Sequence, residues 1–251
     1  MIRFFLLATI LVLSGITTIA QIVNIENARM HSDTTGIMGN AGAALALTKN
    51  TEQVFLFNVN AHVQYKTQKD LYLVLGSYGF LKGSGTNLID NSFLHFRYNR
   101  KINKTLRWEV FTQLQKNLIT KIAYRFLIGT GPRFKIADSK RFKLYTASLL
   151  MFENEKEKST PVILHNDWRN SSYISFTFLP NEQTELVSTS FYQPLINRIN
   201  DYRLLNQTKL IVKAGKRLSV SVNYNYLFDN NPASGTPKTN YSFSTGFDYD
   251  F

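Results

Sequence analysis

The sequence predicts an all-β protein, a closed antiparallel transmembrane β-barrel of about 12 strands. Three observations support this fold class. Residues 241–251 alternate aromatic side chains with polar or acidic ones, as in a strand with one face toward lipid and one toward a lumen. Similar period-2 stretches recur along the chain, and the first 20 residues have the composition of a secretory signal peptide.

The expected strands are evenly spaced and bounded by polar turn residues. Two of them, near residues 71–81 and 146–152, are apolar on both faces. Part of the lumen is therefore expected to be apolar and packed, which favours a narrow or plugged interior over a wide pore. The expected strands lie near residues 37–48, 55–65, 70–82, 94–99, 106–115, 124–133, 140–153, 173–178, 183–193, 203–214, 218–228 and 240–251.

The N-terminal region predicts export. Residues 1–20 contain one charge, Arg3, then an apolar run and a small-x-small site at 18–20. This is typical of a cleaved signal peptide, with an uncleaved anchor as the alternative. Residues 21–36 show no clear period, so they are expected to form a periplasmic lead-in or a plug. Residues 37–251 form the barrel domain, and Phe251 is the expected assembly signal read by the barrel-assembly machinery.

Composition restricts the possible partners and chemistry. The net charge is +12, falling to +11 without Arg3, and 14% of residues are aromatic, which suits the girdles at membrane interfaces. Positive charge favours anionic lipid headgroups or small anionic solutes as partners. No basic helix or stacking module supports binding of nucleic acid. The absence of cysteine excludes disulfides, thiolate metal sites and cysteine nucleophiles.

Loop lengths provide a test of the strand count. With the C-terminus in the periplasm, the long connections are expected outside and the tight turns inside. The run of Glu, Asn and Lys at 153–158 is expected to be a solvated loop crest that could contact lipopolysaccharide. The long outer loops are expected at 82–90, 153–166, 194–201 and 229–239, with short outer turns at 49–52 and 117–121, and the inner turns at 66–69, 102–105, 137–140, 179–183 and 214–216.

The densest polar chemistry lies in residues 91–134. A turn around Asn103 would place Arg97 opposite Glu109, Asn99 opposite Arg107 and His95 opposite Phe111. A turn around Ile119 would place Gln113 opposite Arg125 and Glu109 opposite Gly129. These side chains predict either a lumenal network that holds strand register or a constriction that prefers anions. The candidate lumenal network comprises His95, Arg97, Asn99, Arg107, Glu109, Gln113, Gln115, Arg125 and Arg133.

This segment resembles the DUF481 family of outer-membrane proteins from Gram-negative bacteria. The resemblance rests on His-x-Arg-Tyr-Asn at 95–99, Glu-x-Phe-x-Gln-x-Gln at 109–115 and Arg-x-Leu-x-Gly-x-Gly-x-Arg at 125–133. It is strong over residues 91–134 and elsewhere follows only the general layout. It implies a barrel in the bacterial outer membrane, in contact with the lipid bilayer and lipopolysaccharide. Some members are described as salt-induced proteins, and the resemblance implies no specific activity.

The activity expected from the sequence is structural or that of a narrow passive channel. A surface-interaction barrel and a phospholipase-like enzyme are the alternatives, and a soluble β-sandwich or lipocalin-like barrel is the rival fold. We expect no catalytic, cofactor or metal site. The His-x-Ser motif of a barrel phospholipase is missing at His95 and His165, and the four histidines lack ligand spacing.

Overall fold

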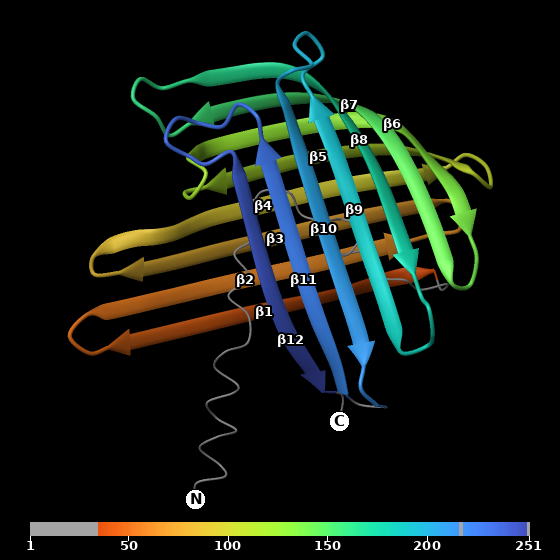
Figure 1. Cartoon of the computed structure of the whole chain (residues 1–251), viewed down its shortest axis with the longest axis horizontal. Coiled ribbons are helices and arrows are strands. Elements are labelled where there is room, and N and C mark those ends of the chain that lie inside the picture. Colours follow the sequence, from red (N-terminus) through yellow and green to blue (C-terminus); the bar gives the residue numbers. More distant parts are fainter. Residues whose placement is uncertain (1–34, 216–217, 250–251) are drawn as a thin grey trace, which may run out of the picture.

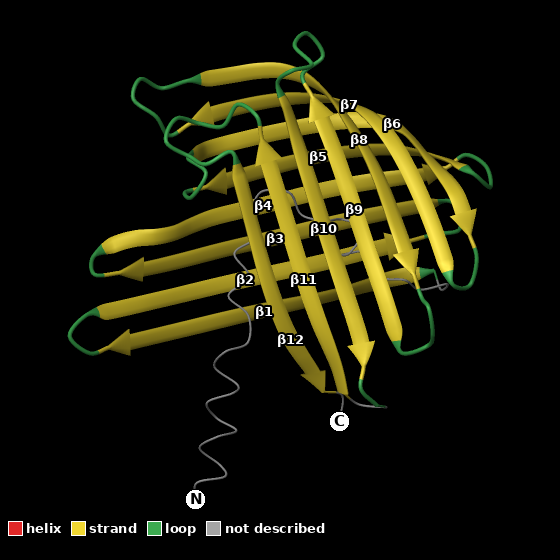
Figure 2. Ribbon diagram, in the orientation of Figure 1, coloured by secondary structure: helices red, strands yellow, loops and turns green. Residues whose placement is uncertain are grey.

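The computed structural model describes residues 35–215 and 218–249, which form a single antiparallel sheet of twelve strands in sequence order (Figures 1 and 2). The predicted number and order of strands are therefore confirmed. The expected signal peptide, nearly all of segment 21–36, and Phe251 lie outside the described residues. The strands are β1 (Gly36–Lys49), β2 (Gln53–Lys66), β3 (Asp70–Gly83), β4 (Thr86–Lys101), β5 (Leu106–Asn117), β6 (Ile122–Asp138), β7 (Phe142–Glu157), β8 (Leu164–Phe178), β9 (Thr184–Pro194), β10 (Tyr202–Lys213), β11 (Leu218–Asp229) and β12 (Thr239–Tyr249).

The sheet curls so that β9–β12 pass in front of β1–β4 in the view of Figure 1. Each strand pairs with the next along the chain, from β1–β2 to β11–β12. Within residues 35–215 and 218–249, β1 and β12 are not paired with each other, so the sheet is not closed. The observed architecture is thus a strongly curled twelve-stranded sheet with one open seam, so the closure that the sequence predicted is not found in the described residues. Within the same residues, no helix is both long and apolar enough to span a membrane.

The two faces of the sheet differ in which side chains they expose, and large apolar side chains are exposed on the outer face, as a membrane barrel requires. On β7, Leu149 is 1% exposed and lies on the inner face, whereas its neighbour Leu150 is 47% exposed on the outer face. Both tryptophans, Trp108 and Trp168, are exposed on the outside, while Glu109 and Arg169 beside them in sequence are buried. A soluble sandwich or lipocalin would bury these apolar side chains, so the inside-out distribution argues against the rival fold.

The interior holds an apolar layer. The sequence predicted such a layer, because two of the expected strands are apolar on both faces. Leu73 and Leu75 of β3 pack with Phe93 of β4. A larger cluster crosses the inner faces of β5 to β11, and its buried members include Leu149 and Met151 of β7. Apolar side chains that exclude water fill this part of the lumen. The larger cluster consists of Phe111, Leu127, Ala147, Leu149, Met151, Tyr173, Phe191, Leu205 and Leu227.

The prediction that the outer connections are long is only partly correct. The connections 158–163, 195–201 and 230–238 are longer than the turns at the opposite end. The predicted outer loop at 82–90 is instead a two-residue turn of Ser84 and Gly85, both with positive φ. This is the backbone geometry of a tight hairpin, and it lets β3 and β4 continue to the turn. The predicted loop 153–166 is also shortened, because β7 continues to Glu157.

Candidate functional site

An inner ion cluster is centred on Glu109 of β5, near the end of the sheet that carries the β4–β5 turn. The fully buried Glu109 lies 3.1 Å from Arg97 Nη1 and 3.7 Å from Arg133 Nη1. Tyr173 Oη donates a 2.9 Å hydrogen bond to the same carboxylate from across the lumen. Arg133 also stacks over the Tyr145 ring at 4.0 Å. Four strands, β4, β5, β6 and β8, are thereby tied together through one carboxylate.

The predicted pairing register in this region is wrong by two residues in both hairpins. Arg97 lies opposite Phe111, Asn99 opposite Glu109, and His95 opposite Gln113. In the next hairpin Gln115 lies opposite Arg125, and Glu109 opposite Gly131. A shift of two keeps every side chain on its predicted face, since side chains alternate with a period of two. The Arg97–Glu109 ion pair forms as a diagonal contact instead of a direct one.

His95 is held as a packed, hydrogen-bonded side chain. Its ring stacks between Phe93 and Phe111, with centroids 6.0 Å and 5.6 Å away. Its Nδ1 is 3.0 Å from Gln113 Oε1, and Arg97 Nε donates to its Nε2 at 3.4 Å. Both ring nitrogens thus have partners within the network.

Most of the predicted network residues are brought together, with two exceptions. Asn99 and Gln115 are buried, and Gln113 Nε2 donates to Gln115 Oε1 at 2.9 Å. Arg107 lies on the same face but is only partly buried at the rim, outside the buried ion pairs. Arg125 does not contact Gln113 as predicted; it belongs to a second cluster.

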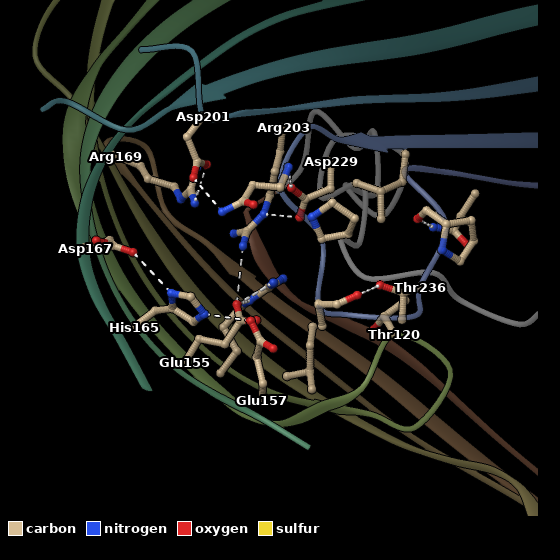
Figure 3. A pocket seen from close by; sticks show the side chains of 18 residues that line it. Thr120, Glu155, Glu157, His165, Asp167, Arg169, Asp201, Arg203, Asp229 and Thr236 are labelled. Carbon is tan, nitrogen blue, oxygen red and sulfur yellow. Dashed lines mark hydrogen bonds and ion pairs between the residues drawn. The ribbon is translucent and has the colours of Figure 1, made fainter. Parts of the chain in front are cut away.

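This outer ion cluster lies at the opposite end of the lumen, and apart from Arg125 its members were missed by the sequence reasoning. Figure 3 labels Arg169, Arg203, Glu155, Asp201 and Asp229 of the cluster. Arg125 Nη2 is 2.5 Å from Glu155. Arg203 contacts Glu153 at 2.5 Å, Asp229 at 2.8 Å and Glu155 at 3.4 Å. Arg169 contacts Asp201 at 3.2 Å and Glu153 at 3.4 Å, so a connected set of buried charges spans the mouth. The outer cluster consists of Arg125, Arg169, Arg203, Glu153, Glu155, Asp201 and Asp229.

The segment 153–158 is therefore not the solvated loop crest that we expected. Glu153, Glu155 and Glu157 occupy alternate positions of β7 and are all buried on its inner face. The signal was present in the sequence, because acids at every second residue continue the strand period. The basic partners of these acids lie on distant strands, so no local pattern identified them.

Two glycines of β6 allow the lumen to be filled this closely. A Cβ at Gly129 would lie 2.5 Å from the Phe111 ring. A Cβ at Gly131 would lie 2.3 Å from the Ser148 carbonyl oxygen and 2.7 Å from Leu149 Cα. The Arg-x-Leu-x-Gly-x-Gly-x-Arg spacing thus places one arginine before and one after a segment where only glycine fits.

A small cavity opens beside the outer cluster, at the mouth formed by the longer connections (Figure 3). Its volume is about 30 Å³, room for about one or two water molecules. The β11–β12 connection covers one side, where Lys121 Nζ donates to Ser234 O at 2.6 Å. Among the described residues, no group of three or more His, Asp or Glu side chains is placed to hold a metal ion.

Comparison with known proteins identifies the family. The model of a family described as "Protein of unknown function, DUF481" matches residues 40–251. The chain belongs to the DUF481 family. The match includes all twelve strands except the start of β1, so the resemblance predicted from the segment 91–134 is confirmed over nearly the whole barrel. No curated protein matches the sequence.

Solved structures similar to this DUF481 chain include a porin, an autotransporter domain and an outer membrane protein. A NanC porin superposes with a TM-score of 0.50 at 10% identity, covering 83% of this chain and 100% of the porin. The translocator domain of the autotransporter NalP from Neisseria meningitidis gives 0.42 at 10% identity, covering 87% and 90%. OmpT, an outer membrane protein of Vibrio cholerae, gives 0.28 at 10% identity, covering 85% and 95%. At this identity, the porin supports the fold alone.

Proposed function

We propose that this chain is an outer-membrane β-barrel that closes in the membrane through β1 and β12 and has no wide pore. The inside-out distribution of side chains supports the membrane setting, because exposed apolar residues occur on the outer faces of strands throughout the sheet. The bilayer, lipopolysaccharide and the assembly machinery are the partners that such a barrel requires.

The observation that carries this proposal is the packed layer at mid-height. Three residues of β7 lie between the inner and the outer cluster and are each at most 2% exposed: Ala147, Leu149 and Met151. Phe111 and Tyr173 reach the same layer from other strands. Apolar side chains thus fill the lumen beside β5–β11 between the two ion clusters, and this packing supports a structural role.

A narrow passive channel is the second candidate, and one observation favours it. The inner faces of β2 and β12 are less covered than those of β5–β10, and Asn60 is exposed while Ser242 and Ser244 are half-buried. A thin polar path beside these strands would bypass the apolar layer. Small anionic solutes are its proposed permeants, because Arg97, Arg107 and Arg133 place positive charge on the lumenal face at one end of the sheet.

Single-channel conductance of the refolded protein in planar bilayers tests both candidates. A silent barrel supports the structural role, and small anion-selective steps support the narrow channel. Large porin-like steps would contradict both, and cation selectivity would remove anionic solutes as permeants. Phe111→Ala is the matched variant: deleting a ring from the packed layer should raise the conductance above that of the parent protein.

The enzymatic alternative has weaker support. The ring nitrogens of His95 contact Gln113 and Arg97, and those of His165 face Glu157 and Asp167. Neither arrangement places a serine hydroxyl on a histidine, as catalysis by a histidine-activated serine requires. The assignment as a non-enzyme stays a prediction, and assays of the purified protein with phospholipid substrates test it.

A further inference from the structure

We propose that the cavity at the outer mouth binds the ammonium group of a small organic amine, with Glu157 as the counter-ion. The cavity is separate from the inner network and lies between the end of β7, the start of β8, and the connections 118–121 and 230–238 (Figure 3). Its occupant is inferred from three features: the residual charge, the unused hydrogen-bonding atoms and the size of the space.

The negative charge of the mouth is unevenly neutralised. The three arginines that line the cavity, Arg125, Arg169 and Arg203, are each bonded to carboxylates of the outer cluster. Glu157 and Asp167 have no arginine or lysine partner among the described residues; only His165 lies beside them, 2.7 Å from Glu157 Oε1 and 3.9 Å from Asp167 Oδ2. Excess negative charge is therefore concentrated at one wall of the cavity.

Two buried oxygen atoms on this wall have no hydrogen-bond partner. Glu157 is 7% exposed, and its Oε2 accepts no bond although Oε1 contacts His165. Thr120 Oγ1 is also buried and unpartnered. Both residues line the cavity, and Thr120 lies two residues before Ile122, which pairs with Glu157 across β6 and β7. A buried carboxylate oxygen without a donor is costly, so a ligand that donates hydrogen bonds is favoured there.

The size of the space selects the ligand group. A volume of about 30 Å³ admits a group the size of a water molecule. An ammonium group has this size, carries the complementary charge, and has three donors to offer Glu157 Oε2, Thr120 Oγ1 and a third acceptor. A divalent metal is disfavoured, since no three ligating side chains converge within the described residues. The alkyl part of the amine would extend outward through the open mouth.

Titration calorimetry with the full chain, refolded in detergent at low ionic strength, tests this assignment with 1,4-diaminobutane as the probe. We expect saturable binding that Glu157→Gln weakens at least tenfold, because the amide keeps the shape and removes the charge. Glu52→Gln is the matched control: it removes an exposed outer acid in the β1–β2 turn and should leave binding unchanged. Butane-1,4-diol, which lacks the positive charge, should not bind.

Thr120→Val provides a second variant that retains the charge, and it should weaken binding severalfold. Retention of the folded, heat-modifiable band on electrophoresis shows that each variant is intact. Equal binding by the parent and Glu157→Gln would overturn the assignment, as would equal binding of the diol. Tighter binding of Mg²⁺ than of the diamine would replace it with a metal site, and the absence of saturable binding would mean that the cavity holds water only.

Discussion

Three buried carboxylates in this lumen, those of Glu109, Glu153 and Glu155, are each shared between arginines. Glu109 contacts two arginines, Glu155 two and Glu153 three, with all of these side chains nearly inaccessible. Sharing offsets part of the cost of removing these charges from water, since each carboxylate has more than one guanidinium beside it. Removing any one of these three carboxylates therefore takes an acceptor away from more than one arginine.

Glu109→Gln is predicted to destabilise the barrel. The change removes the carboxylate charge that Arg97 and Arg133 share in a buried site, and loss of a buried ion-pair partner typically costs about 3–5 kcal/mol in the free energy of unfolding. Denaturant unfolding in detergent measures it. Asp138→Asn is the control, because its partner Lys135 lies in an exposed pair at 2.6 Å and such pairs contribute about 1 kcal/mol or less. Equal losses in the two variants would show that Glu109 is not the centre of the inner cluster.

How much of the site could be predicted depends on the distance between partners in the sequence. The inner cluster was largely predicted, because Arg97, Glu109 and Arg133 lie on three successive strands and face inward by parity. Tyr173 was missed, since it crosses the lumen from β8 to reach Glu109. The outer cluster joins β6, β7, β8, β10 and β11, and no spacing in the sequence shows which arginine meets which acid.

At the scale of the strand, the alternation of side chains determines which face of the sheet each residue occupies. The turn residues determine the register in which neighbouring strands pair. Alternation identified most of the strands, the less regular ones were placed by their spacing, and even the shifted hairpins kept their inward residues inward. In the first of these hairpins, the error of two residues arose at the β4–β5 turn, which the sequence reasoning centred on Asn103. In the structure, Asn103 Oδ1 accepts bonds from the amides of Thr105 and Leu106, so the turn is centred later. Side-chain caps of this kind are hard to place from sequence alone.

Gly131→Ala is predicted to strain the β6–β7 pair. The added methyl group would meet the backbone of Ser148 and Leu149, which cannot rotate away as a side chain could. Overpacking of this type costs roughly 1–3 kcal/mol in the free energy of unfolding. Gly76→Ala is the matched control in β3, where the nearest atom is Leu94 Cδ1 at 3.8 Å. Denaturant midpoints of the two variants should differ, with Gly131→Ala the lower; identical midpoints would mean that β7 moves aside freely.

At the scale of the whole molecule, the unpaired seam conflicts with a membrane setting. An antiparallel sheet with a free edge leaves a row of backbone amides and carbonyls without partners. In hydrocarbon each such group costs several kcal/mol, which is why spanning sheets are closed. The outer faces of this chain are suited to lipid, so the edges of β1 and β12 are expected to meet in the bilayer.

Hydrogen exchange of the full chain in lipid nanodiscs tests closure of the seam. In a curled but open sheet, only the amides of β1 that bond to β2 are protected, and the alternate ones exchange quickly. In a closed barrel, pairing with β12 protects the alternate amides as well, so β1 as a whole should exchange as slowly as β6, which has partners on both sides. Alternating fast and slow amides along β1 in the lipid-embedded protein would contradict closure, and with it the proposal that this sheet spans the outer membrane as a barrel.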